Sequence, residues 1–211
     1  MRVLVTGATG LIGTAVCARL LAEGHDVVRA MKHRPDQRKA DPSIVTIDMA
    51  KALKPEDWDD ALNGIDAVVN CAGVLQDSAS ERTTEVHATG AASLFRACER
   101  AGVRRLIHFS AIGVDREQPS AFSSSKLAGD EALMKHNLDW IILRPSVVLG
   151  RPVFGASALL RGLAALPVLP VMPDTGRLQV VQLDDVTATV AFSCGRRAPR
   201  GLPWNLQVRR P

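Results

Sequence analysis

Short runs of apolar, often β-branched residues alternate along the chain with longer segments whose apolar residues recur at helical spacing. The first pair shows the pattern, because Val3–Thr6 predicts a strand and Leu11–Glu23, which stops at Gly24, predicts a helix. Such alternation is typical of consecutive β-α-β units. A continuous apolar run such as 67–69 favours a parallel sheet that helices cover on both faces. We therefore expect an α/β fold with a doubly wound parallel sheet.

The same alternation continues as far as Pro145. The further strands that we expect are Asp26–Met31, Ile44–Asp48, Asp66–Asn70, Arg105–Ser110 and Trp140–Arg144. The helices that we expect between them are Pro55–Leu62, Thr84–Arg100 and Phe122–His136.

The pattern changes after Pro145, where prolines interrupt the alternation. The elements that still fit are helices at Ser157–Ala165 and Asp185–Cys194 and strands at Leu178–Gln182 and Trp204–Val208. We therefore expect a main domain over residues 1–150, to which the motifs described below assign dinucleotide binding. A short C-terminal extension, residues 151–211, should pack on that domain. The proline-rich run 166–173 is apolar and fits either the wall of a small pocket or an exposed surface patch.

Composition excludes several classes of protein. The chain has 211 residues, of which 46% are hydrophobic and 23% charged, which argues against disorder. The net charge of +4 is too evenly spread for a nucleic-acid-binding stripe, and we expect no metal site. Four separated cysteines without a C-x-x-C pair argue against a disulfide scaffold and favour the cytoplasm. No run is long enough to span a bilayer, and the glycines among residues 3–18 argue against a secretory signal.

A glycine-rich turn separates the first strand from the first helix. Gly7 permits a tight turn, Gly10 lets the backbone approach a pyrophosphate, and Gly13 allows the helix to pack closely on the sheet. The helix N-terminus adds unpaired N–H groups and a positive dipole. This strand–turn–helix context predicts a dinucleotide-binding site. Its residues include Thr6, Gly7, Thr9, Gly10, Leu11, Ile12 and Gly13.

The end of the second strand decides which dinucleotide is preferred. An acidic residue there would accept hydrogen bonds from a ribose 2′-hydroxyl of NAD, whereas basic residues suit the 2′-phosphate of NADP. Here the segment is basic, and the first carboxylate is that of Asp36. We therefore expect Arg29 and Arg34 to favour NADP(H) over NAD(H).

These motifs resemble the short-chain dehydrogenase/reductase superfamily, in its extended and atypical branch, whose fold is of the Rossmann type. The T-G-x-x-G-x-x-G turn is followed in the expected order by further landmarks of that family. They are Asp48-Met49, which resembles the pair at the adenine, Asn70-Cys71-Ala72-Gly73, which resembles the N-x-A-G turn beside the cofactor, Ser110 at the catalytic serine position, Phe122-Ser123-Ser124-Ser125-Lys126 at the Y-x-x-x-K signature, and Leu143-Arg144-Pro145.

Within that superfamily the chain resembles NAD(P)-dependent epimerase/dehydratase-like proteins and the NADPH-binding accessory subunit of respiratory complex I. The resemblance covers residues 1 to about 190. It implies that the chain could keep a nucleotide without obvious turnover. It also hints at a homodimer or a complex with a protein partner.

Two positions depart from the family pattern. Phe122 stands where the family has its catalytic tyrosine, and the chain contains no tyrosine at all, so classical Tyr–Lys catalysis is excluded. His87 stands where the family often has asparagine, and it could relay a proton or be structural. Lys126 fits a role in binding the nicotinamide ribose. Ser110 could hold a carbonyl group or only end a strand.

Two functions remain open at this point. The first is an NADP(H)-binding protein with weak or non-classical activity, acting as a redox-sensing or structural module. The second is an active NAD(P)-dependent oxidoreductase or epimerase acting on a small carbonyl or quinone, with His87 or a serine transferring the proton. An intact cofactor motif beside Phe122 favours the first.

Overall fold

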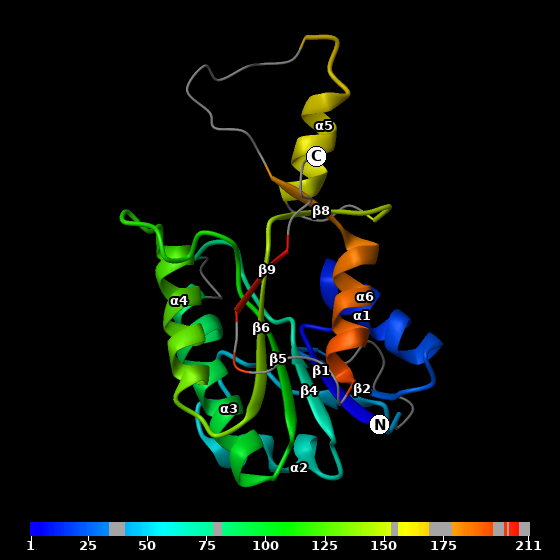
Figure 1. Ribbon diagram of the computed structural model, residues 1–211, viewed down its shortest axis with the longest axis vertical. Helices are drawn as coiled ribbons and strands as arrows, with labels where there is room; N and C mark the ends of the chain where they lie inside the picture. The colour runs from blue at the N-terminus through cyan, green and yellow to red at the C-terminus, as the bar shows by residue number, and fades with distance from the viewer. Residues whose placement is uncertain are drawn as a thin grey trace.

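Seven parallel strands form one sheet, in the order β3-β2-β1-β4-β5-β6-β9 (Figure 1). The computed structural model describes residues 1–33, 41–77, 82–152, 156–168, 179–195, 201 and 203–206. The strands of this sheet are β1 (Arg2–Thr6), β2 (Asp26–Met31), β3 (Ile44–Thr46), β4 (Ala67–Asn70), β5 (Arg105–Phe109), β6 (Asp139–Pro145) and β9 (Pro203–Leu206). A second, two-stranded sheet pairs β7 (Val147–Leu149) with β8 (Val180–Gln182).

Helices cover both faces of the large sheet. On one face lie α1 (Leu11–Ala22) and α6 (Leu183–Cys194), and on the other lie α3 (Ala91–Arg100) and α4 (Ala121–Met134) (Figure 1). The remaining helical segments are η1 (Pro55–Trp58), α2 (Asp59–Leu62), the π-helical η2 (Glu85–Gly90) and α5 (Ala156–Ala164). This arrangement confirms the predicted doubly wound α/β fold.

Strand β1 shows why the sheet needs two covers. Successive side chains of a strand point to opposite faces, and in β1 all of them are apolar in the middle of the strand. Val3 and Val5 pack with α1 and α6, while Leu4 packs with the cluster that includes α3. All three are fully buried, as the continuous apolar runs in the sequence predict.

The strand order reverses next to β1, which has β2 on one side and β4 on the other. At such a switch point the connections leave in opposite directions, and a crevice opens at the carboxyl ends of the two central strands. Thr6 ends β1 and Asn70 ends β4, and the two residues are register partners. The Thr6 hydroxyl donates a 2.6 Å hydrogen bond to the Asn70 side-chain oxygen.

The expected elements agree with the structure apart from their ends and one turn. The expected third strand ends at Thr46, two residues early, and residues 207–208 of the expected last strand lie outside the described residues. Within the expected helix Thr84–Arg100, residues 85–90 form a π-helical turn. Here the chain passes close to its neighbours, because a Cβ on Gly90 would lie 2.1 Å from the Met49 carbonyl oxygen.

The segment beyond residue 150 adds to the same layers. Strand β9 pairs with β6, and α6 packs against α1. In the proline-rich run, Leu166 and Val168 are exposed, and residues 169–173 lie outside the described residues. The division of the chain at residue 150 stays a prediction. In the described part of the chain no helix has the length and hydropathy to cross a membrane, and no group of three potential metal ligands occurs there.

Candidate functional site

The turn between β1 and α1 is built without side chains at its tightest points. Gly7 has a φ of +63°, and a Cβ there would lie 2.7 Å from the Ala72 nitrogen. A Cβ on Gly13 would lie 2.1 Å from the Gly7 carbonyl oxygen. The turn is closed by a 3.0 Å hydrogen bond from the Gly10 nitrogen to the Gly7 oxygen. Gly10 is the N-cap of α1 and supplies no side-chain cap, so the first N–H groups of α1 remain available to an anion.

A cavity of about 210 Å³ lies at the switch point, in front of this turn. The phosphate turn, the ends of β2 and β3 and the turn after β4 all contribute to it. The predicted site residues that line it are Thr6, Gly7, Thr9, Gly10, Asp48, Met49, Cys71, Ala72 and Gly73. Leu11, Ile12 and Gly13 form the first turn of α1. The lining residues that the sequence did not single out are Ala30, Met31, Lys32, Ile47, Trp58, Val74 and Val86.

The basic residues at the end of β2 differ in what they contact. Arg29 lies within β2, two residues before its end, and its guanidinium lies 3.3 Å from the Asp41 carboxylate and 3.0 Å from the Ser43 hydroxyl. Arg29 is not among the described residues that line the cavity, and its role at a 2′-phosphate stays a prediction. Lys32 follows the strand directly, lines the cavity and lies 3.7 Å from the Asp48 carboxylate. Arg34 lies outside the described residues.

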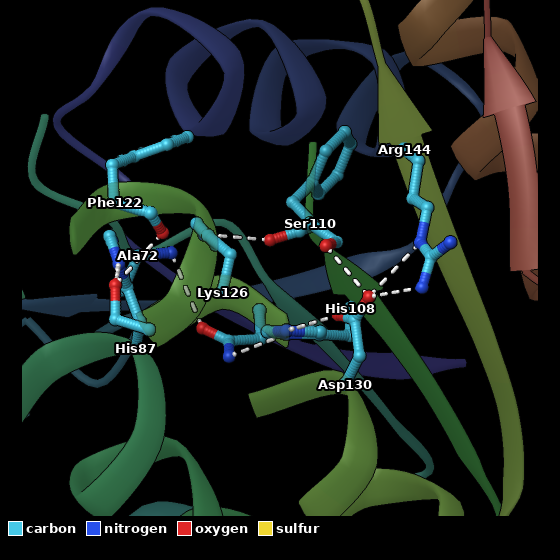
Figure 2. Close-up of polar contacts among 11 residues, drawn as sticks. Ala72, His87, His108, Ser110, Phe122, Lys126, Asp130 and Arg144 are labelled. Atoms are coloured by element: carbon cyan, nitrogen blue, oxygen red, sulfur yellow. Dashed lines mark hydrogen bonds and ion pairs between the residues drawn. The ribbon is translucent and has the colours of Figure 1, made fainter. Parts of the chain in front are cut away.

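Three residues four positions apart on α4 form one stripe along the helix. They are Phe122, Lys126 and Asp130, and residues at this spacing share a helix face. Helix α4 begins after Ser120, whose hydroxyl accepts a 3.2 Å hydrogen bond from the Ser123 nitrogen. Lys126 and Asp130 are buried, and Phe122 is half-buried. Each of the three meets a different group at the carboxyl end of β5 or on η2 (Figure 2).

Both ring nitrogens of His87 already have partners. Nε2 accepts a 3.0 Å hydrogen bond from the Val74 nitrogen, and Nδ1 lies 2.9 Å from the Ser125 hydroxyl. Since that hydroxyl donates to the Phe122 carbonyl oxygen, we assign the proton of the neutral ring to Nδ1. Burial, together with the Lys126 charge, lowers the pKa of His87 to about 3. His87 is therefore neutral near pH 7, which favours its structural role over a proton relay.

The ring of Phe122 stands edge-on to that of His87. The ring centroids are 5.4 Å apart and the planes are at 89°. A phenol at this position would bring an exchangeable proton, whereas a phenyl ring brings only apolar surface.

Lys126 is buried beside the turn after β4. Its Nζ donates a 2.8 Å hydrogen bond to the Phe109 carbonyl oxygen, and a Cβ on Gly73 would lie 3.2 Å from that Nζ. Burial lowers the pKa of Lys126 to about 8, although Asp130 and Cys71 oppose the shift. Gly73 also lines the cavity, so Lys126 lies next to the cavity wall.

The hydroxyl of Ser110 donates a hydrogen bond to a buried carboxylate. This hydroxyl lies 2.9 Å from Asp130 Oδ2, which also accepts bonds of 2.9 and 3.1 Å from the Arg144 guanidinium (Figure 2). Burial raises the pKa of Asp130, and the bonds from Ser110 and Arg144 oppose that shift. Sequence reasoning missed Asp130, although its place on the stripe with Phe122 and Lys126 was a usable signal.

A second buried histidine joins this group to the phosphate turn. The Asn70 amide nitrogen lies 3.0 Å from His108 Nδ1, and His108 Nε2 lies 3.5 Å from Asp130 Oδ1. Because Asn70 also accepts from Thr6, a line of polar side chains runs from β1 to α4. Burial lowers the pKa of His108 well below its usual value, so this ring is neutral.

The two ends of the site therefore offer different chemistry. At the cavity end, the glycine turn is packed so closely that it has no room for a Cβ at Gly7 or Gly13. The first N–H groups of α1 lie beside this turn and have no side-chain cap. These features fit a pyrophosphate. At the α4 end, the donors of Ser110 and His87 are already used within the protein.

Comparison with known proteins agrees with this geometry. The NAD(P)H-binding protein family matches residues 7–162. The uncharacterized protein Rv2047c of Mycobacterium tuberculosis is 32% identical over 185 residues, which are 88% of this chain and 19% of that protein. The ceramide reductase of Caulobacter vibrioides is 28% identical over 211 residues, covering 99% of this chain and 65% of the reductase. The chain thus spans less than two thirds of the length of these relatives.

Solved structures share the fold. A short-chain dehydrogenase/reductase superfamily protein from Agrobacterium tumefaciens, with bound NAD, superposes with a TM-score of 0.77 at 20% identity, over 98% of this chain and 77% of the other. The UDP-glucose 4-epimerase of Thermus thermophilus, in complex with NAD, gives 0.73 at 24% identity, over 98% and 78%. The chain belongs to the NAD(P)H-binding protein family, and it shares its Rossmann-type fold with structures of the short-chain dehydrogenase/reductase and epimerase proteins named above.

Proposed function

We propose that the chain binds NADP(H) in the cavity and acts as a redox-sensing or structural module with weak or non-classical oxidoreductase activity. The observation that carries this proposal is the contrast between the open phosphate turn and Phe122 at the position of the catalytic tyrosine. A missing general acid typically costs about 10²–10⁴-fold in rate. His87 and Ser110, the two substitutes considered from the sequence, make their hydrogen bonds within the protein.

The described residues suggest how the dinucleotide is held. The first N–H groups of α1 and the turn at Gly7 would bind the pyrophosphate, and Asp48 and Met49 would lie on the adenine side of the cavity. Lys126 would bind the ribose hydroxyls at the other end. When bound, the nicotinamide group supplies or accepts a hydride. The protein would then hold and orient the ring without a phenolic proton donor.

The preference for NADP(H) rests on Lys32. This residue lines the cavity directly after β2, where the ribose of the adenosine half is read in this fold. Asp48 lies 3.7 Å away and partly balances the charge of this lysine. A 2′-phosphate would bring two negative charges to the same place. The compared structures hold NAD, so this preference is our proposal.

Binding and turnover have to be measured on the same sample. NADPH fluorescence titration tests binding, and absorbance at the nicotinamide band follows oxidation with a panel of aldehydes, ketones and quinones. We expect saturable binding without turnover across the panel. Saturable binding with rapid turnover in the wild type would contradict the proposed weak activity. Absence of any NADPH or NADH binding would overturn the proposal as a whole.

The Phe122→Tyr variant tests whether the phenol is the one catalytic group that is missing or whether further catalytic groups are missing as well. If the phenol alone is missing, the variant should oxidise NADPH at least about tenfold faster than the wild type. If Ser110 is also committed to Asp130, NADPH should bind but turnover should stay at the wild-type level. The structure favours the second result. Phe122→Leu is the matched control, since it removes the ring without adding a hydroxyl.

Lys126 and one relative favour a second candidate function, reduction of a carbonyl group. The pKa of Lys126 is lowered to about 8, so this buried ammonium can exchange a proton near neutral pH. The Caulobacter relative is a ceramide reductase. If this chain reduces a carbonyl through Lys126, its rate should fall as pH rises through about 8, because the acid form is lost. A pH-independent rate across that range would exclude Lys126 as the acid.

A further inference from the structure

A second cleft lies outside the dinucleotide cavity, where α1, α5 and α6 meet the loop after β7. Its volume is about 820 Å³, and its described lining shares no residue with the cavity. Three arginines reach it from separate elements. Arg19 comes from α1, Arg151 from the loop, and Arg161 from α5.

The arginines are held in different ways. Arg161 donates bonds of 3.2 and 2.8 Å to the carbonyl oxygens of Arg151 and Gly150, so its guanidinium is fixed at the loop. Arg19 lies 2.6 Å from Glu23, one turn further along α1. Arg151 is exposed at the edge of the cleft. A guanidinium carries five N–H donors, so each of these groups keeps donors beyond the contacts just named.

The charge of the cleft is positive even after its acidic neighbours are counted. Asp184 is the acidic residue among the described lining residues, and Glu23 balances part of the Arg19 charge. The remaining lining is largely small or apolar and includes Ala15, Ala18, Leu149 and Leu183. The cleft thus combines three exposed arginines with a lining that is otherwise largely small or apolar.

We propose that this cleft docks an extended acidic segment of a partner protein. Its carboxylates would pair with Arg151, Arg161 and Arg19, since guanidinium groups bind carboxylates through two parallel hydrogen bonds. Its small side chains would cover the apolar lining residues, such as Leu149 and Leu183. A small ligand is typically enclosed over most of its surface, whereas the arginines of this cleft stand exposed at its rim. The proposal does not depend on nucleotide binding, although it suits a structural module.

A defined probe can test the proposal on the full chain. The probe is a fluorescein-labelled peptide of five Glu-Ala repeats, and five Gln-Ala repeats serve as its neutral control, both followed by fluorescence anisotropy. We expect the Glu peptide alone to bind, and its affinity to fall several-fold between about 50 mM and 300 mM salt, because exposed charges are screened. Equal binding of both peptides would overturn the proposal.

Three single substitutions locate the binding site. Arg151→Glu should weaken the Glu peptide by about tenfold, because it replaces an attraction with a repulsion. Arg96→Glu makes the same charge change on α3, at the opposite face of the sheet, and should weaken binding less than about twofold. Asp184→Asn should strengthen binding by about two- to fivefold, a gain that misfolding cannot produce.

Two outcomes would contradict the docking site. If Arg151→Glu and Arg96→Glu weaken the peptide equally, the peptide senses only net charge. If tripolyphosphate binds more tightly than the peptide and Arg151→Glu abolishes its binding, the cleft takes a small phosphorylated ligand instead. NADPH titration of the same variants reports on the proposed function separately, and circular dichroism checks their fold.

Discussion

The phosphate end and the α4 end of the site lie at the same edge of one sheet but depend on different parts of the chain. At the phosphate end the site is made of backbone groups. Gly7 and Gly13 allow neighbouring backbone to approach closely, and the first N–H groups of α1 remain available to an anion. At the α4 end, side chains satisfy one another, as Ser110 does with Asp130 and His87 with Ser125. A backbone site survives changes of side chain, whereas a site made of side chains changes its chemistry with one substitution.

The contrast also extends to stability. Paired buried groups stabilise and order the fold and withdraw their donors from chemistry, and Ser110 and Arg144 are paired with Asp130 in this way. Among the described residues, His108 Nε2 and Asp130 Oδ1 are buried in the same group without a hydrogen-bond partner. The stripe on α4 therefore serves the fold. The first N–H groups of α1, by contrast, have no side-chain cap and remain available to a ligand. Substitutions at the α4 end should consequently act on folding, whereas those at the phosphate end should change nucleotide binding as well, and four such tests follow from the largest expected effect to the smallest.

Asp130→Ala should cost the most stability. It leaves the Arg144 guanidinium buried and without its internal partner, a change that typically costs about 3–5 kcal/mol of unfolding free energy. Urea denaturation measures it. Asp115→Ala is the matched control, since Asp115 pairs with the same arginine but its side chain is 64% exposed, and it should cost less than about 1 kcal/mol. Equal losses would show that the α4 network does not hold the fold.

Gly13→Ala should damage both stability and binding. The added Cβ would lie 2.1 Å from the Gly7 oxygen, and overpacking of this kind costs about 1–3 kcal/mol. NADPH affinity should fall at least about tenfold, because the turn must shift. Gly10→Ala sharpens the test, since its Cβ would meet the Gly7 oxygen at 3.4 Å and stability should hold while the approach of the phosphate is hindered. If Gly13→Ala kept full affinity, the turn would not be the phosphate site.

The sequence predicts the phosphate end better than the α4 end for a physical reason. Glycine spacing at 7, 10 and 13 reports local backbone geometry, which neighbouring residues largely decide. The partners of Ser110 and His87 come from 20 and 38 residues away, and only the packed fold brings them together. Sequence reasoning therefore left both residues with open roles.

The basic residues at the end of β2 show a further limit of prediction from the sequence. Arg29, Lys32 and Arg34 belong to one basic run, and from the sequence alone we expected Arg29 and Arg34 to read the phosphate. Arg29 lies before the end of the strand and contacts Asp41 and Ser43, whereas Lys32 lies past the end and reaches the cavity. A shift of three residues decides which of the two cations lines the cavity, and strand ends are the least predictable feature of a pattern.

The pH dependence of stability tests whether His87 can take up a proton in the folded protein. The pKa of His87 is about 3 in the folded protein against an ordinary 6.5, so the unfolded chain binds the extra proton between these values. Stability should therefore fall as pH drops from 6.5 toward 3, by up to about 1.4 kcal/mol per pH unit. In His87→Gln this part of the slope should vanish, whereas His108, whose pKa is lowered mainly by burial and only in smaller part by His87, still contributes to both proteins. Identical slopes in urea denaturation at pH 4–6.5 would show that His87 titrates normally and remains a candidate relay.

Lys32→Ala should give the smallest effect, and it tests whether Lys32 distinguishes NADPH from NADH. Its ammonium is partly exposed and shares its charge with Asp48, so removing it should weaken NADPH by only about fivefold, or about 1 kcal/mol, and leave NADH nearly unchanged. Fluorescence titration with each nucleotide measures the ratio. Lys51→Ala, which removes an exposed lysine nearby, should change neither affinity. If Lys32→Ala weakens both nucleotides alike, the residue shapes the cavity without reading the 2′-phosphate, and the preference for NADP(H) would have to come from elsewhere in the chain.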